Sequence, residues 1–135
     1  MSHFTTIKTK LKERLYLIEA LELLQYNVKE NQELVIANPD HREDHPVVHA
    51  EITISEDIGF RWNETTESYD LYCDRGTWNL NVPVERFVDK VNQQYSRMSI
   101  HNIVKEEGFQ VLEEWEMDDN SIELVVTRWN WENRV

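Results

Sequence analysis

Three histidines at four-residue intervals form the densest set of potential metal ligands in the sequence. His41, His45 and His49 share one polar segment with the acids Asp40, Glu43 and Asp44. Imidazole and carboxylate ligands suit zinc, iron, nickel or manganese, and a helix would bring the three imidazoles onto one face. Pro46 opposes such a helix, because its ring clashes with the carbonyl group four residues earlier. We therefore predict a solvated loop, and the alternative is a metal site at His41, His45 and His49.

Cys73 is the only thiol that could act as a nucleophile. It continues the alternating pattern of Tyr69 and Leu71, which predicts a buried side chain, and Asp70 and Asp74 stand beside it. Burial and negative neighbours both raise the pKa of a thiol, which is the opposite of activation. We predict a small core residue, and a single cysteine excludes an internal disulfide.

Asp74, Arg75 and Trp78 place an acid, a guanidinium group and an indole at one predicted turn. Turns beside rigid hairpins often carry binding residues, so a polar pocket here would suit a small-molecule-binding or enzymatic domain. A structural ion pair, with Trp78 packed on the core, explains the same residues. The sequence contains no spaced carboxylate pair, glycine-rich phosphate loop, nucleophile elbow or Cys-x-x-Cys motif. It therefore assigns no catalytic residue and no cofactor.

Tryptophan and acidic residues alternate near the end of the chain. Trp115 stands in the acidic run of residues 113–119, and Trp129 and Trp131 follow it. Exposed indoles beside acids suit docking onto a basic protein surface, because tryptophan anchors interfaces and the charges steer the encounter. For Trp115, a side chain that points inward from a strand with an acidic outer face is an equally good interpretation.

A predicted helix begins at Pro83 and positions this C-terminal part. Its apolar residues recur at intervals of three and four, and they are Val84, Phe87, Val88, Val91, Tyr95 and Met98. The pattern weakens at residues 96–99, which predicts a kink and a second short helix, and Gly108 ends the helical region. Residues 111–117 and 121–129 then read as a hairpin around the turn residues 118–120.

The preceding residues must supply a sheet for this helix. We expect a strand at residues 4–11, a helix at 12–25 and a short hairpin of residues 26–28 and 33–37 around a turn at 30–32. A loop at 38–47 leads to strands at 49–55, 58–62 and 69–73, the last two forming an antiparallel hairpin, and a short strand at 78–82.

These elements predict an α+β fold, with a single antiparallel sheet and two main helices packed on one face. Residues 1–135 are expected to form a single globular domain. The two helix exits, residues 23–28 and 107–111, are similar, so a diverged internal duplication is one of two interpretations.

The charge of the chain is strongly negative, with 26 Asp and Glu against 14 Lys and Arg and a formal net charge of -12. Such a field repels phosphate backbones and anionic membrane surfaces, so nucleic-acid binding is not expected. The apolar runs are too short to insert into a membrane, and no leader is apparent. A basic protein partner fits this charge.

A series of short segments runs in a fixed order over nearly the whole chain: Met1-Ser2-His3-Phe4, Ile7-Lys8-Thr9, Gly59-Phe60-Arg61-Trp62-Asn63, Tyr69, Leu71, Asp74, Trp78, Phe87, Asp89-Lys90, Gln93-Gln94-Tyr95, Glu107-Gly108-Phe109, Ser121-Ile122 and Arg128-Trp129-Asn130. In these residues the chain resembles the hypothetical chloroplast open reading frame 35 family of cyanobacteria and algal plastids. The resemblance implies a cyanobacterial cytoplasm or a plastid stroma, and a partner such as an AAA+ ATPase or a photosynthesis-related complex. It implies no reaction, cofactor or catalytic residue.

We therefore expect an accessory or adaptor protein that docks onto a larger protein partner and has no catalysis of its own. The expected partner-binding residues are Trp78, Asp74, Arg75, Trp115, Trp129 and Trp131. The alternative is a small-molecule-binding or enzymatic domain with a polar pocket near Asp74, Arg75 and Trp78.

Overall fold

The computed structural model describes residues 4–35, 47–119 and 121–128. Within these residues the elements follow in the order β1 (Thr5–Lys8), α1 (Arg14–Leu23), β2 (Lys29–Val35), β3 (Val47–Thr53), β4 (Ile58–Asn63), β5 (Ser68–Cys73), α2 (Val84–Glu106), β6 (Phe109–Glu116) and β7 (Ile122–Arg128). All strand pairs among them are antiparallel. The fold class is α+β, as the sequence predicts.

Five strands form the main sheet, in the order β1-β5-β4-β3-β2. The hairpin of β4 and β5 is confirmed, and its register sets Ile58 opposite Cys73 and Phe60 opposite Leu71. These four side chains are buried, because the period-two pattern places them all on one face of the sheet. That face is the one that the helices cover.

The core lies between this face and both helices, with Phe87 of α2 at its centre. Phe87 meets three aromatic rings, with ring centroids 5.4 Å away for Tyr26, 6.4 Å for Phe60 and 5.4 Å for Trp78. Leu17 and Leu21 of α1 are fully buried in the same core. Edge-to-face and offset contacts of this kind add to the free energy gained from burying the rings.

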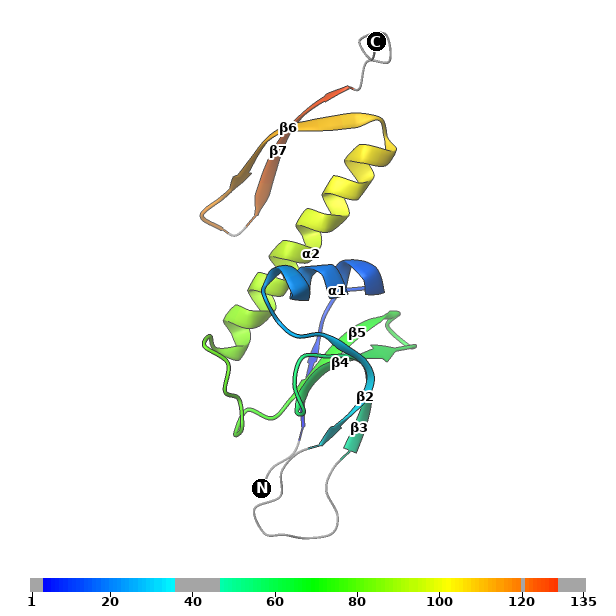
Figure 1. The fold of residues 1–135 in the computed structure, drawn as a ribbon, viewed down its shortest axis with the longest axis vertical. Coiled ribbons are helices and arrows are strands. Elements are labelled where there is room, and N and C mark those ends of the chain that lie inside the picture. The colour runs from blue at the N-terminus through cyan, green and yellow to red at the C-terminus, as the bar shows by residue number, and fades with distance from the viewer. Residues whose placement is uncertain (1–3, 36–46, 120, 129–135) are drawn as a thin grey trace.

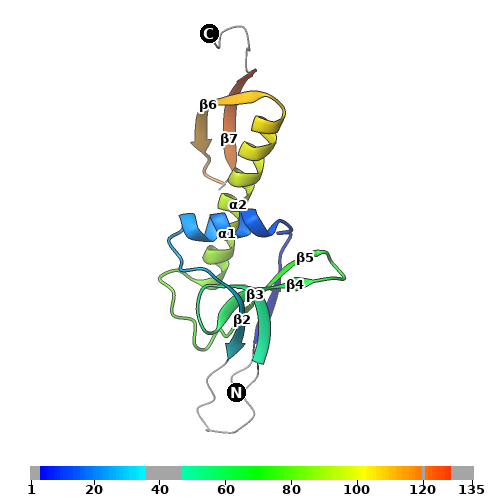
Figure 2. The ribbon, with the colours of Figure 1, turned by 45° about the vertical axis from the view of Figure 1, so that its right-hand side comes forward.

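Helix α1 crosses α2 above the sheet (Figures 1 and 2). The start of α1 has no side-chain cap, but the Tyr95 hydroxyl of α2 binds the backbone just before its first residue. It accepts hydrogen bonds from the backbone N–H groups of Lys12, at 3.1 Å, and Glu13, at 2.8 Å. An unpaired N–H at a helix start is thus satisfied by the neighbouring helix.

Helix α2 is continuous over 23 residues, so the predicted kink at residues 96–99 and the second short helix are wrong. Gly108 ends it as predicted, with a positive φ of 82° that glycine adopts without a steric penalty. Only the first half of α2 lies on the main sheet. Its second half extends beyond, and β6 and β7 lie along that half at the opposite end of the molecule from the main sheet (Figures 1 and 2).

The sequence predicts the hairpin β6–β7, which is present, but as part of a single sheet, which is wrong. These strands form a separate two-stranded sheet. The duplication stays a prediction: α1 has ten residues and leads into the main sheet, whereas α2 leads into the separate hairpin.

Two local predictions in the N-terminal half also differ from the structure. The expected turn at residues 30–32 lies inside one continuous strand, β2, where Asn31 takes a positive φ of 55° that asparagine tolerates. Residues 78–82 form no strand, because Trp78 turns inward onto Phe87 instead of pairing along a sheet.

Candidate functional site

The hairpin β6–β7 has one face toward α2 and one face toward solvent. Its register pairs Glu114 with Leu124 and, one step along, Trp115 with Glu123. Side chains of successive strand residues point to opposite faces, so these two pairs lie on different sides of the hairpin. We call the side that carries Glu113, Trp115, Glu123 and Val125 the outer face.

Glu114 fastens the other side of the hairpin to α2. Its carboxylate forms an ion pair with Arg97, at 2.5 Å from Nε to Oε1, and lies 3.0 Å from Nε2 of His101. Burial disfavours the charged carboxylate, but the hydrogen bonds and charges of Arg97 and His101 outweigh it and hold the pKa of Glu114 below its usual range. Arg97 and His101 are four residues apart, on one side of α2.

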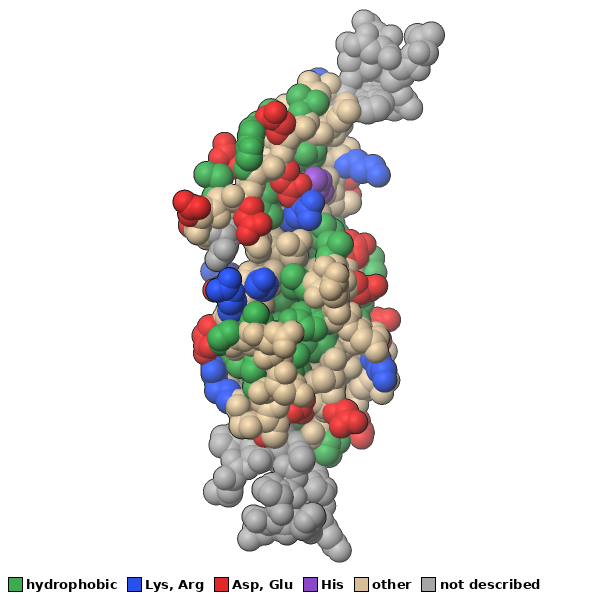
Figure 3. Space-filling view, turned by 60° about the vertical axis from the view of Figure 1, so that its left-hand side comes forward, with side chains coloured by type: hydrophobic (Ala, Val, Ile, Leu, Met, Phe, Trp, Pro, Cys, Tyr) green, Lys and Arg blue, Asp and Glu red, His purple; other side chains and the backbone are tan. Residues whose placement is uncertain are grey.

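The outer face exposes large apolar side chains between acids. Trp115 is 46% exposed and Val125 is 37% exposed. Beside this face, Leu112, at the irregularity in the register of β6, is 57% exposed. In the upper part of the molecule in Figure 3, hydrophobic and acidic side chains lie next to one another, with Lys, Arg and His side chains among them. Such a surface can bind a partner that offers both apolar contacts and positive charge.

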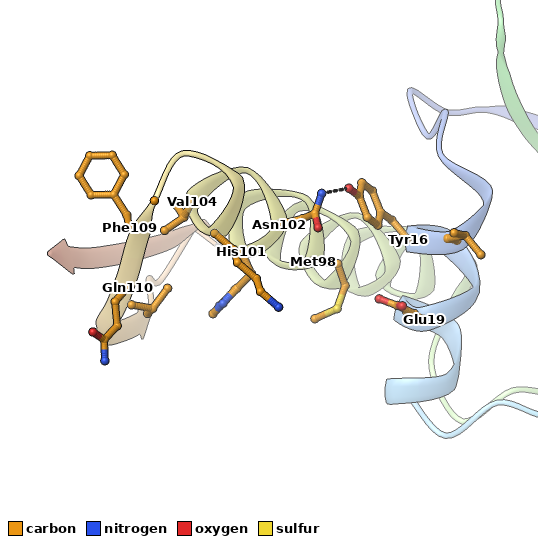
Figure 4. Close-up of a pocket in the computed structure, with 12 residues that line it drawn as sticks. Tyr16, Glu19, Met98, His101, Asn102, Val104, Phe109 and Gln110 are labelled. Carbon is orange, nitrogen blue, oxygen red and sulfur yellow. Dashed lines mark hydrogen bonds between the residues drawn. The ribbon is translucent and has the colours of Figure 1, made fainter. Parts of the chain in front are cut away.

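A groove of about 950 Å³ lies between α1 and the region where α2 passes into β6 (Figure 4). The residues that line it are mostly apolar, and they are Leu15, Tyr16, Glu19, Met98, His101, Asn102, Val104, Lys105, Gly108, Phe109, Gln110 and Val111. The Asn102 side chain donates a hydrogen bond to the Tyr16 hydroxyl and joins the two helices. Burial and then the carboxylates of Glu106 and Glu13 raise the pKa of Tyr16, so its phenol is neutral at physiological pH.

The predicted turn at Asp74, Arg75 and Trp78 exists, and each of its side chains has a structural contact. Asp74 is buried, and its Oδ1 accepts a hydrogen bond from the backbone N–H of Gly76 at 2.8 Å. Arg75 forms an exposed ion pair with Glu85 at 2.8 Å. Trp78 packs on Phe87, and its indole N–H donates to a backbone carbonyl at 2.8 Å. None of these three residues lines the groove of Figure 4 or three further grooves of the described structure.

The remaining predicted residues are distributed over the chain. Trp129, Trp131, His41 and His45 lie outside the described residues, and His49 is an exposed residue of β3. Among residues 4–35, 47–119 and 121–128, no three His, Cys, Asp or Glu side chains are grouped as a metal would need.

Cys73 is fully buried in the core, as predicted. Burial raises the pKa of its thiol, and the carboxylates of Asp74 and Asp57 add to this effect. The Cys73 thiol is therefore not an activated nucleophile.

Sequence reasoning missed the contacts of Glu114 with Arg97 and His101. These residues belong to different elements and are 13 to 17 positions apart in the chain, so no local spacing connects them. The sequence does contain one signal for such contacts. In residues 113–116, acids occupy both faces of the predicted strand, and Trp115 is the only apolar residue among them.

No helix in the described part of the chain is long and apolar enough to cross a membrane.

Taken together, the fold and the site define a small α+β protein in which a long helix carries a separate, partly apolar hairpin. Residues 20–125 match the family described as "Protein of unknown function (DUF1257)", and the chain belongs to that family. It is also similar to "Uncharacterized protein ycf35" of Pyropia yezoensis, with 34% identity over 97% of this chain and 100% of the relative. The proteins of the same name from Guillardia theta and Cyanophora paradoxa are 33% and 31% identical, over 96% and 97% of this chain and 98% and 100% of their own lengths.

These matches confirm the resemblance that the sequence shows to the chloroplast open reading frame 35 family. No solved structure matches the chain.

Proposed function

We propose that this protein is an accessory or adaptor protein that docks onto a larger, basic protein partner through the outer face of the hairpin β6–β7. The observation that carries the proposal is the burial pattern of β6, in which an acid faces the helix and a tryptophan faces solvent. Glu114 turns inward to Arg97 on α2, whereas the neighbouring Trp115 is 46% exposed. A hairpin that served only its own fold would bury the indole and expose the acid, because burying a large ring stabilises a fold and burying a charge is costly.

The charges around Trp115 indicate the chemistry of the partner. Glu113 and Glu123 lie on the outer face, and Asp118 and Asp119 are exposed at the turn of the hairpin. The hydroxyl and backbone N–H of Ser121 hold the pKa of Asp119 below its usual range, so this carboxylate is charged at neutral pH. A partner with Lys or Arg around an apolar pocket complements this surface, the indole being the anchor.

The same proposal includes the compartment and two partner classes. We place the protein in the cyanobacterial cytoplasm or the plastid stroma, and the partners to test first are an AAA+ ATPase and photosynthesis-related complexes. Trp129 and Trp131 follow β7 directly in sequence and are proposed as further contacts. Asp74, Arg75 and Trp78 contribute less in this proposal, because each is already engaged within the chain.

The experiment is affinity purification of the tagged full chain from a cyanobacterial lysate, at low and then at moderate salt, with identification of the bound proteins. We expect one partner in a fixed ratio, which Trp115→Ala loses and rising salt releases. The matched control is Leu23→Ala, which removes an exposed apolar side chain from the end of α1. The proposal is wrong if no partner is recovered in a fixed ratio, or if Trp115→Ala and Leu23→Ala retain it equally.

A further inference from the structure

The two edges of the hairpin β6–β7 differ in how well they are protected against another strand. β6 has an irregular register between Val111 and Glu113 and carries three acids, Glu113, Glu114 and Glu116. Bulges and charges are the devices by which proteins block strand addition at an edge. β7 runs Ile-Glu-Leu-Val-Val-Thr-Arg, and its pairing with β6 contains no extra residue on its own side.

The far edge of β7 is without a strand partner in the part of the chain that the structure describes. Val125 and Val126, on opposite faces of β7, are each 37% exposed. A strand added at this edge would cover both side chains in part. It would also turn a two-stranded ribbon, which is marginally stable by itself, into a sheet with more strands.

We propose that this edge binds β7 of a second copy of the same chain, giving a four-stranded antiparallel sheet in the order β6-β7-β7-β6. The inference goes beyond the docking function proposed above and does not depend on it.

The charges favour a second copy at this edge. A chain with a net charge of -12 resists self-association unless the contacting surface is neutral. β7 is such a surface, since Glu123 and Arg128 are its only charged residues and cancel. The acidic β6 strands would lie about 14 Å apart, three strand spacings, which exceeds the Debye length of about 8 Å at physiological salt.

The sequence of β7 is also compatible with pairing to itself. Antiparallel pairing of all seven residues sets Val125 opposite Val125, Leu124 opposite Val126, Glu123 opposite Thr127 and Ile122 opposite Arg128 of the other copy. No like charges face each other, and β-branched and aliphatic residues fill the centre. Because the acidic, bulged β6 strands form the new outer edges, the assembly stops at two copies.

The pairing has a consequence for the outer face. Residues that are directly opposite in a sheet lie on the same side, so the outer faces of both copies join into one surface. The two Trp115 side chains then lie on the same side of one sheet, and a partner with two basic sites would bind both with increased avidity.

The test uses the purified full chain without any partner, so that its result is independent of the docking experiment. Sedimentation equilibrium of the wild type is expected to give twice the chain mass. The dimer should strengthen as salt rises, because salt screens the net charge, whereas docking through acids should weaken. Val125→Glu and Val125→Lys are each expected to raise the dimer dissociation constant at least about tenfold, because each sets like charges opposite one another. An equal mixture of the two variants should associate again.

A conservative variant guards against loss of folding. Val125→Cys should give a disulfide-linked dimer under mild oxidation, because opposite residues of antiparallel strands have Cα atoms about 4.5–5.5 Å apart, within disulfide range. Thr127→Cys is the matched control, since each Thr127 would face Glu123 of the other copy and the two thiols would be too far apart. A monomeric wild type, equal cross-linking of the two cysteine variants, or association that Val125→Glu and Val125→Lys both retain would overturn the proposal.

Discussion

Replacing Glu114 by alanine should release the hairpin β6–β7 from α2 while the main sheet stays folded. The substitution removes the ion pair with Arg97 and the contact with His101. Hydrogen bonds to charged groups contribute about 1.5–3 kcal/mol, and because Arg97 and His101 are about a third exposed, we expect a loss of about 1–2 kcal/mol. Such a loss corresponds to a roughly 5- to 30-fold larger equilibrium constant for opening of the hairpin, and so to faster hydrogen exchange.

Hydrogen exchange followed by mass spectrometry measures this opening peptide by peptide. Peptides from residues 109–128 should exchange faster in Glu114→Ala, and peptides from β4 and β5 should keep their wild-type rates. The matched control is Glu113→Ala, which removes the same side chain one position earlier, on the outer face. Equal acceleration in both variants, or faster exchange of β4 and β5 in Glu114→Ala, would show that Glu114 does not hold the hairpin in the way described.

Three further predictions concern the same structure. Because Arg97 helps to hold the pKa of Glu114 below its usual value, the stabilisation from this ion pair is present at neutral pH and is lost as the pH falls through the lowered pKa. The amide NMR signals of β6 and β7 should therefore follow this titration on acidification, and those of β4 and β5 should not. Phe87→Ala should lower the free energy of unfolding by about 3–5 kcal/mol in urea titration, because three aromatic rings lose their shared contact. Gly59→Ala should cost about 1–3 kcal/mol in the same assay, because its new Cβ would lie 2.9 Å from a backbone carbonyl oxygen of β3.

The sequence predicts well the elements that pack one face on the core. The apolar residues Ile58 and Phe60 of β4 and Tyr69, Leu71 and Cys73 of β5 recur at every second position, and all five are buried where this alternation places them. The first half of α2 shows a clear apolar stripe, since Val84, Phe87 and Val91 all lie on the core. In these segments the periodicity and the burial have a common cause, which is contact with a single large core.

The wrong predictions concern the segments that do not pack on the main core. The apolar pattern weakens at residues 96–99 because α2 leaves the main sheet there and meets polar partners, as the pairs Arg97–Glu114 and Asn102–Tyr16 show. The weak pattern therefore marks a change of packing partner and not a kink. For the same reason the pattern of β6 and β7 predicts a hairpin but not the sheet to which it belongs, because sheet membership depends on contacts between distant residues.

The candidate site was predictable only in part. Trp115 and Trp78 are the same residue type, yet Trp78 packs on Phe87 and Trp115, in β6, is exposed. What separates them is the surface available to each: residues 74–83 run beside the core, whereas β6 lies against a polar stretch of α2. The sequence leaves open whether Trp115 is buried or exposed, and the path of α2 decides it.

The length of α2 connects the two proposals. A helix of this kind holds the hairpin away from the main core, so opening of the hairpin need not unfold the rest of the chain. The hairpin is therefore a part of the molecule whose stability a bound strand or partner can change by a large factor, because its own contacts with α2 are few and partly polar. If the second copy binds at β7, exchange protection of residues 109–128 should rise with protein concentration while that of β4 and β5 stays constant. If the exchange protection of the hairpin is the same at all protein concentrations, no second copy binds at β7. The exposed valines and Trp115 can then only bind a different protein.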